Sequence, residues 1–275
     1  MKKDKKNKIF KDKVFIILLI MLVLVTIWLL LTIVSNRNNL KLNDKTLNEI
    51  HNYFNFDDLD KCEGLFNYTD KKVNSKNIED EIKNCIAYNK SDIKNIEEET
   101  LKTESKKNIC KKDDMIFRAE DDTTECKITK IKKKYIDNTY KKIFGEGIGN
   151  IESFKVDNFN ICYLSNDYYY CGLSETFTYT IGSESSIYRV LNRAVEKGNQ
   201  IVIYDYFIRI NNDKCYSNYT TSNINSECND KYSKLKKKKI DYKFMKKYGT
   251  EYKHIYEKAK DGTYYWVSSE PVTKK

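Results

Sequence analysis

Acid–base catalysis near neutral pH most often uses histidine, and this chain of 275 residues contains two, His51 and His254. They fall in different expected elements. His254 stands between tyrosines in a stretch that alternates like a strand, which favours a half-exposed strand histidine over a general base. Two Asp-Asp pairs, at 57–58 and 121–122, are adjacent in expected loops, and nothing in the sequence brings them together. The motifs G-x-x-x-x-G-K-[ST], H-E-x-x-H and G-x-S-x-G do not occur in the sequence.

The eight cysteines could be nucleophiles, metal ligands or disulfides. Their spacing contains no C-x2-C pair and matches no zinc pattern. The segment Thr123-Thr124-Glu125-Cys126 resembles the Thr-x-x-Cys of sortases, but the Leu of that signature and a suitably spaced His are missing. We therefore expect structural disulfides and predict no catalytic residue, cofactor or metal site. The cysteines expected to be oxidised are Cys62, Cys85, Cys110, Cys126, Cys162, Cys171, Cys215 and Cys228.

Eight cysteines allow 105 full pairings, and local spacing narrows them. Cys162 and Cys171 flank an expected hairpin with a two-residue turn at Asn166-Asp167. In that register they face each other at a non-hydrogen-bonded position, about 4.5 Å apart at Cα, which suits a disulfide. Cys215 and Cys228 bracket a polar loop. The remaining four would then pair in sequence order, as 62/85 and 110/126.

A second signal is the stretch Val14–Val34, which has 21 residues and no charge, Gly or Pro. As a helix it is about 31 Å long, enough to cross a bilayer core. Residues 2–13 carry seven Lys against two Asp, a net of 7 − 2 = +5, which predicts a cytoplasmic N-terminus. A cleaved signal peptide is the rival interpretation, but the length and the lack of a small-x-small site favour a retained signal-anchor.

This topology places residues 35–275 outside a cell membrane that the chain crosses once. All eight cysteines then lie in an oxidising compartment, in agreement with structural disulfides. We expect a cytoplasmic tail over 1–13, a transmembrane helix over 14–34 and a short stalk over 35–42.

The strongest charge feature outside the tail is Lys231–Lys247, with nine Lys against one Asp, a net of 9 − 1 = +8. Outside the cell such a patch would meet anionic lipid headgroups or wall polymers rather than nucleic acid. The alternative is a solvated charged loop without a partner. The lysines proposed for anionic-surface binding are Lys234, Lys236, Lys237, Lys238, Lys239, Lys243, Lys246 and Lys247.

Apolar periodicity predicts the elements that would position these residues. Asn43 and Ser75 are potential N-caps of helices over 43–54 and 75–88. Residues 91–103 predict a weak helix, and residues 115–117 a short strand. A longer helix is expected over 124–144, with Gly145 as its left-handed stop.

After this helix the apolar period changes to two, which is typical of strands. The expected strands cover residues 151–156, 160–165, 168–173, 186–196, 200–210, 250–258 and 263–269. The last hairpin turns at Asp261-Gly262, through either a two-residue turn or a three-residue bulged turn. The two alternatives exchange the partners of Tyr256 and Trp266.

Helices followed by hairpins predict an α+β fold, with a helical disulfide-containing subdomain over 43–122 and an α+β domain over 123–275. The helix ending IFG and the closing YKHIYEKAKDGTYYWVSSEPV resemble the C-terminal halves of uncharacterised single-pass surface proteins of low-GC Gram-positive bacteria. The order of elements over 124–271 is similar to NTF2-like and cystatin-like modules, in which a long helix packs on a curved antiparallel sheet. This resemblance implies fold and location and carries no activity.

Taken together, these features predict a non-catalytic binding or scaffolding module at the cell envelope. The alternative is an anchored enzyme that acts on envelope polymer or peptide in a cone-shaped pocket.

Overall fold

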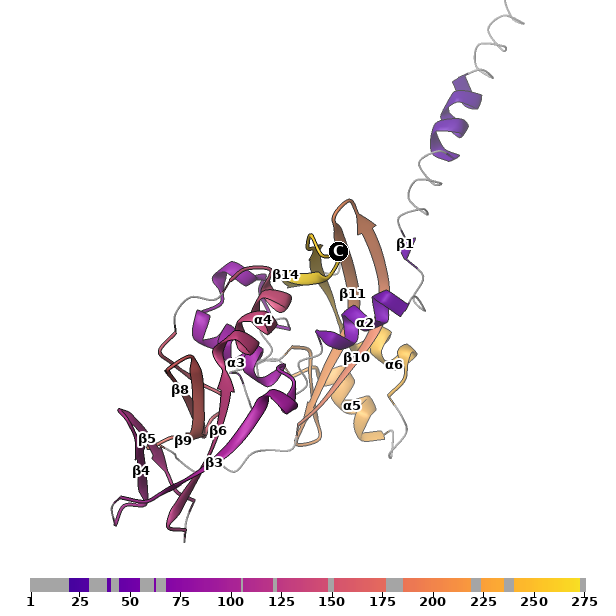
Figure 1. The fold of residues 1–275 in the computed structure, drawn as a ribbon. Coiled ribbons are helices and arrows are strands. Elements are labelled where there is room, and N and C mark those ends of the chain that lie inside the picture. The colour runs from indigo at the N-terminus through magenta and orange to yellow at the C-terminus, as the bar shows by residue number, and fades with distance from the viewer. Residues whose placement is uncertain are drawn as a thin grey trace, which may run out of the picture.

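The computed structural model has an α+β fold with antiparallel sheets, as the sequence predicts (Figure 1). The residues that it describes are 20–29, 39–40, 45–54, 62, 68–104, 106–120, 123–147, 151–176, 185–218, 224–234 and 240–272.

The larger sheet has the strand order β1-β10-β11-β13-β14-β2, with β12 also paired to β11. Its strands are β1 (Asn39–Leu40), β2 (Val73–Asn74), β10 (Ser185–Lys197), β11 (Gln200–Asn211), β12 (Lys214–Tyr216), β13 (Thr250–Lys258) and β14 (Tyr264–Pro271). The pairing of Lys197 with Gln200 closes the β10–β11 hairpin over two residues, and Gly198 there has a φ of 60°. Such a turn favours glycine because it needs a positive φ.

The final hairpin has the three-residue bulged turn. Lys258 pairs with Tyr264, and the N–H of Ala259 donates to the carbonyl of Thr263 over 2.7 Å. Gly262 has a φ of 88°, the left-handed conformation that this turn requires. The resulting register pairs Tyr256 with Trp266.

A second sheet has the order β3-β6-β9-β8-β7, beside a separate β4–β5 ladder. These strands are β3 (Ile96–Lys102), β4 (Ile109–Lys112), β5 (Met115–Arg118), β6 (Glu125–Lys132), β7 (Ser153–Lys155), β8 (Asn160–Ser165) and β9 (Tyr168–Leu173). The sequence predicted a single curved sheet. The hairpins divide between two sheets because β3 and β6 pair with each other, and β6 then pairs with β9.

One predicted helix was wrong, and another was wrong in its first part. Residues 124–132 form strand β6, and α4 (Lys133–Phe144) begins only after it. Cys126 and Ile128 are buried, whereas Glu125 and Lys127 are exposed, and this alternation is the period of a strand. The predicted helix over 91–103 is a 3-10 turn at Ile93–Asn95 followed by β3. The predicted stop was correct, since Gly145 follows α4 with a φ of 76°.

The other helices are α2 (Lys45–Tyr53), α3 (Asp80–Asn89), α5 (Ser226–Lys234) and α6 (Tyr242–Tyr248). Leu47 and Ile50 of α2 and Phe54, directly after it, are buried, as the predicted apolar side indicates. Helix α3 starts later than its predicted cap Ser75, because Ser75–Asn77 form a 3-10 turn. Residues 43–122, expected to be helical, also contain strands β2 to β5.

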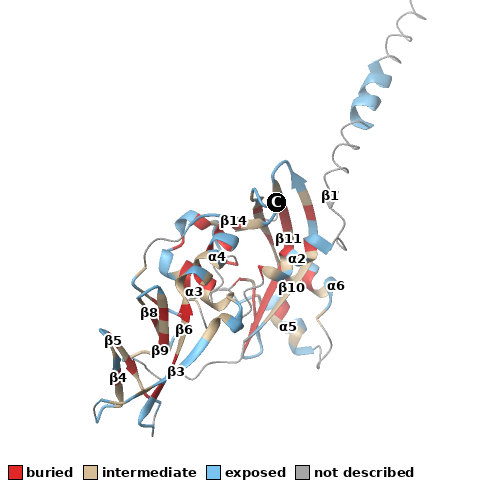
Figure 2. Cartoon of the chain, in the orientation of Figure 1, coloured by how far each residue is buried: buried red, intermediate tan, exposed pale blue. Residues whose placement is uncertain are grey.

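The main core joins both sheets to α2, α3 and α4 (Figure 2). Ile50, Ile136, Tyr169, Ile203 and Trp266 belong to this one cluster, although they come from five separate elements of the sequence. A smaller core lies under the β4–β5 hairpin, and another lies between the larger sheet and helices α5 and α6.

The predicted transmembrane segment is described only in part, as a helix over 20–29. Within the described ranges, no helix reaches the length and apolar character needed to cross a membrane. Residues 14–19 and 30–34 of the predicted span lie outside those ranges, as does the predicted tail over 1–13.

Candidate functional site

The two histidines of the chain converge on one buried carboxylate, Asp205 in β11. His254 Nε2 in β13 lies 3.0 Å from Asp205 Oδ1, and His51 Nε2 in α2 lies 3.0 Å from Asp205 Oδ2. The sequence predicted a half-exposed His254. That prediction was wrong, because the residue is 1% exposed and Asp205 is fully buried.

Strand register explains how part of this cluster forms. His254 pairs across β13 and β14 with Ser269, and Asp205 lies diagonally from His254 on the adjacent β11. The three side chains therefore form a line across three neighbouring strands. His254 Nδ1 lies 2.6 Å from Ser269 Oγ, which also accepts a hydrogen bond from Trp266 Nε1 over 2.8 Å.

Tyr68 adds a second line of polar contacts from outside the sheet. Its hydroxyl donates to Asp205 Oδ2 over 2.6 Å, and Arg189 Nη1 donates to that hydroxyl over 2.9 Å. The Tyr68 ring stacks on Phe207 with centroids 4.4 Å apart. The Tyr252 hydroxyl donates to the Tyr68 carbonyl over 3.1 Å. The segment that carries Tyr68 is thus fixed to the sheet through both its side chain and its backbone.

The environment of Asp205 stabilises its ionised form. Burial alone would raise the pKa of this carboxyl, but His254 and His51, by charge and by hydrogen bonding, lower the pKa well below its usual range. The carboxylate accepts from both imidazoles and from Tyr68. Burial has the opposite consequence for Tyr68, whose pKa is raised well above its usual value.

Hydrogen bonds connect four side chains in sequence at this site. Trp266 Nε1 donates to Ser269 Oγ, which also lies 2.6 Å from His254 Nδ1. The other ring nitrogen of His254 donates to the Asp205 carboxylate. Arg189 adds a positive charge near this carboxylate through its hydrogen bond to Tyr68.

The order Ser269–His254–Asp205 is that of a catalytic triad, but the cluster is closed. Ser269 is 2% exposed, His254 1% and Asp205 0%, so a substrate does not reach the hydroxyl in this structure. A cavity of about 270 Å³ lies elsewhere, where α5, α6 and β13 meet, and Lys247 and Glu251 are among its lining residues. Within the described ranges, no group of three or more His, Cys, Asp or Glu side chains is placed to hold a metal ion.

The described lysines of the proposed anionic-surface site gather on two helices. Lys234 lies at the end of α5, and Lys243, Lys246 and Lys247 lie on α6, all of them exposed. The other four proposed lysines, Lys236, Lys237, Lys238 and Lys239, lie outside the described residues. Helices α5 and α6 both cover the core cluster of the larger sheet that contains Cys228 and Met245.

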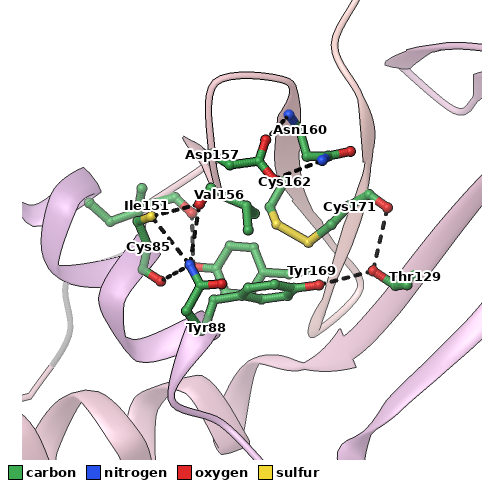
Figure 3. Close-up of a disulfide and its surroundings, with 11 residues drawn as sticks. Cys85, Tyr88, Thr129, Ile151, Val156, Asp157, Asn160, Cys162, Tyr169 and Cys171 are labelled. Carbon is green, nitrogen blue, oxygen red and sulfur yellow. Dashed lines mark hydrogen bonds between the residues drawn. A yellow bond between two sulfur atoms is a disulfide. The ribbon is translucent and has the colours of Figure 1, made fainter. Parts of the chain in front are cut away.

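All four predicted disulfides are present. Cys162 and Cys171 pair in the predicted register with Cα atoms 4.0 Å apart, and both turn residues between β8 and β9 have positive φ, 47° and 63° (Figure 3). The other three bonds join residues with Cα separations of 5.7 to 6.1 Å, namely Cys62–Cys85, Cys110–Cys126 and Cys215–Cys228. None of the eight cysteines is free.

The Cys162–Cys171 bond lies beside two tyrosine anchors. Tyr169 donates its hydroxyl proton to the Ile151 carbonyl over 3.0 Å, and Tyr88 of α3 is hydrogen-bonded to Thr129 of β6 over 3.0 Å (Figure 3). These contacts attach α3 and the segment before β7 to the smaller sheet. The bond therefore belongs to the scaffold of this sheet and not to a redox centre with a free thiol nearby.

No protein-family model, curated protein or solved structure matches this chain. The site therefore has to be interpreted from its own geometry. Sequence reasoning missed Asp205, Tyr68 and Ser269. A signal for Asp205 was available, because it is the only polar residue within the apolar and aromatic stretch 201–208.

Proposed function

We propose that this chain is a membrane-anchored extracytoplasmic protein whose folded domain binds or scaffolds a partner at the cell envelope. Residues 14–34 would be the single signal-anchor helix, with residues 1–13 in the cytoplasm. The observation that carries the proposal is the pairing of all eight cysteines in four intrachain disulfides. Such a set of bonds persists in oxidising compartments outside the cytoplasm.

The helix over 20–29 supports the anchor. Nine of its ten residues are large and apolar, and these side chains are 47% to 65% exposed. Exposed apolar surface of this extent is unfavourable in water, at about 25 cal/mol per Å². A helix that is apolar on every side favours burial in lipid.

Binding is favoured over catalysis because the only cluster of His, Asp and Ser found in the described residues is buried and hydrogen-bonded. The alternative function, an anchored enzyme, is favoured by one observation, the triad-like order of Ser269, His254 and Asp205. Replacing Ser269 with Ala distinguishes the two. A structural role predicts a loss of about 1–2 kcal/mol of stability, whereas a catalytic role predicts loss of a hydrolytic activity in a protein of normal stability.

The similarity to NTF2-like and cystatin-like modules remains part of this proposal. The two segments that carry the resemblance meet in space. The ring of Phe144, at the end of α4, lies 6.4 Å from Trp266 of the final hairpin, with the rings at 80°. A helix packed on the last hairpin of an antiparallel sheet supports the proposed module.

Topology in intact cells tests the proposal. With tags at both ends, external protease should remove the C-terminal tag and spare the N-terminal tag. A thiol reagent added under denaturing, non-reducing conditions should label no cysteine. A soluble fragment of 35–275 in the medium, or eight reactive thiols, would contradict the anchor and the compartment respectively.

A further inference from the structure

The outward sides of α5 and α6 carry an interaction surface, and we propose that it binds a polyanionic polymer outside the membrane. This inference depends on the proposed extracytoplasmic location. The surface consists of five exposed lysines, Lys231, Lys234, Lys243, Lys246 and Lys247, and is called the lysine surface below.

Packing of the two helices directs these lysines outward. Cys228 is the buried residue of α5, and Met245 is that of α6. Both belong to one core cluster, which also contains Ile208 and Ile210 of β11. The lysines of each helix recur at spacings of three or four residues, so they are neighbours along the exposed side.

The lysines of this surface differ from many other lysines of the chain in their ion pairs. Elsewhere, buried or half-buried lysines have carboxylate partners, such as Lys83 with Glu146 at 2.8 Å and Lys253 with Glu270 at 2.6 Å. Within the described residues, none of the five lysines of the lysine surface has an ion-pair partner. The nearby Asp241 is occupied, because its Oδ1 accepts the N–H of Phe244 at the start of α6.

The α5–α6 region is held to the sheet by specific bonds. The Cys215–Cys228 disulfide joins α5 to β12, and Asn225 Nδ2 donates to the Tyr248 carbonyl at the end of α6 over 2.8 Å. The ring of Tyr242 lies 6.1 Å from that of Tyr206 in β11. The lysines are therefore presented from a fixed base, which lowers the ordering cost of binding a charged chain.

Strand geometry favours a polymer over the headgroups of the protein's own membrane. The chain that arrives from the anchor joins the larger sheet at β1, which pairs with Ala194 and Val195 beside the β10–β11 turn. Helix α5 packs at the other end of β11, where Ile210 pairs with Cys215. Helix α6 packs nearer the middle of β11, where Tyr242 lies on Tyr206. Six residues of strand separate Gln200 from Tyr206 and ten separate it from Ile210, or about 20 Å and about 33 Å. A polymer that extends away from the bilayer can reach this end of the domain.

Lysine makes point-charge contacts, so the expected binding tolerates different anions and depends on salt. The test uses the full-length protein in a non-ionic detergent, with heparin and long-chain polyphosphate as probes. Affinity for both should fall steeply between about 50 mM and about 300 mM salt. Vesicles containing phosphatidylglycerol form a parallel arm of the experiment.

Two variants with the same change in net charge test whether binding depends on the lysine surface or on net charge alone. The first replaces the five lysines of the lysine surface with Gln. The matched control replaces five exposed lysines elsewhere with Gln, namely Lys71, Lys72, Lys76, Lys106 and Lys127. We expect the first variant to bind the polymers at least about tenfold more weakly and the control to change by less than about twofold.

Three results would overturn the inference. They are no binding of either polymer at low salt, equal losses in the two variants, and binding to the vesicles without binding to the polymers. Thermal unfolding of both variants excludes loss of the fold as the cause. None of these results would affect the topology assay, so the proposed anchored location is tested separately.

Discussion

The Asp205 cluster and the lysine surface use charged groups in opposite ways on the two faces of one strand, β11. Asp205 is fully buried, and its hydrogen-bond partners come from α2, β13 and the segment that contains Tyr68. The lysines above α5 and α6 are exposed and have no ion-pair partner among the described residues. Charge that is buried has to be matched for the chain to fold, whereas exposed charge is available for a partner. Stability should therefore depend on the first group and binding on the second.

The largest effect on stability is expected from Asp205→Asn. The amide removes the charge that balances Arg189 and an acceptor used by the histidines and Tyr68. Removing one partner of a buried charged network costs about 3–5 kcal/mol. Urea unfolding should show this loss, while Asp230→Asn on exposed α5 should change stability by less than about 0.5 kcal/mol. Equal stability of both variants would mean that the cluster does not hold the fold together.

Removing the Cys215–Cys228 disulfide should affect the region of α5 more than the Asp205 cluster. The bond closes a loop with a sequence separation of 13, so its loss should cost about 3 kcal/mol in the chain-entropy account. The double Ser variant should also bind heparin more weakly, because α5 loses its link to β12. Hydrogen exchange should rise around α5 and remain low for β13. If β13 exchanges as fast as α5, the two regions unfold as one unit.

The stability that the Asp205 cluster contributes should decrease as pH falls. The pKa of Asp205 is lowered in the folded chain, so the stability it contributes is fully present above the unfolded pKa of about 3.9. That contribution is lost as pH falls below this value toward the folded pKa. Urea midpoints measured from about pH 5 to about pH 2 should decline more steeply for the native chain than for Asp205→Asn. Parallel curves would assign the acid sensitivity to other carboxyls.

The smallest effect on stability is expected from the five-lysine variant of the lysine surface. Exposed charges without partners contribute little to folding, so the free energy of unfolding should change by less than about 0.5 kcal/mol. The same variant should show the large loss of heparin affinity. A loss of more than about 1 kcal/mol would instead mean that these lysines stabilise their helices.

Local signals in the sequence predicted much of the β-structure. The strands over 160–165, 168–173 and 250–258 have the predicted bounds, because period-two alternation and turn residues with positive φ specify a hairpin locally. The Cys162–Cys171 pair followed from the same register. Residues 124–132 were misassigned because the spacing of Ile128, Ile131 and Tyr135 also fits a helix. Only the pairing with β3 and β9 resolves that ambiguity.

The candidate site was not predictable in the same way. His51 and Asp205 are separated by 154 residues, and Tyr68 and Asp205 by 137. No periodicity relates residues so far apart, and their meeting depends on how α2 packs across the larger sheet. The line from Asp205 to Ser269 was closer to being predictable, since it needs only the two strand registers. The predicted alternatives for the last hairpin left one of those registers open.

The pairing of β1 with β10 and of β2 with β14 determines when the larger sheet can form during synthesis of the chain. Residues 39–40 emerge early, but their partners, Ala194 and Val195, are made more than 150 residues later. Val73 of β2 pairs with Ser269, which is close to the end of the chain, so β2 can pair only at a still later stage of synthesis. The larger sheet is therefore completed only after the ribosome has made the final hairpin, while Cys162 and Cys171 can meet within one short hairpin much earlier. A chain truncated before Tyr264 should retain that local bond and leave β2 without its neighbour.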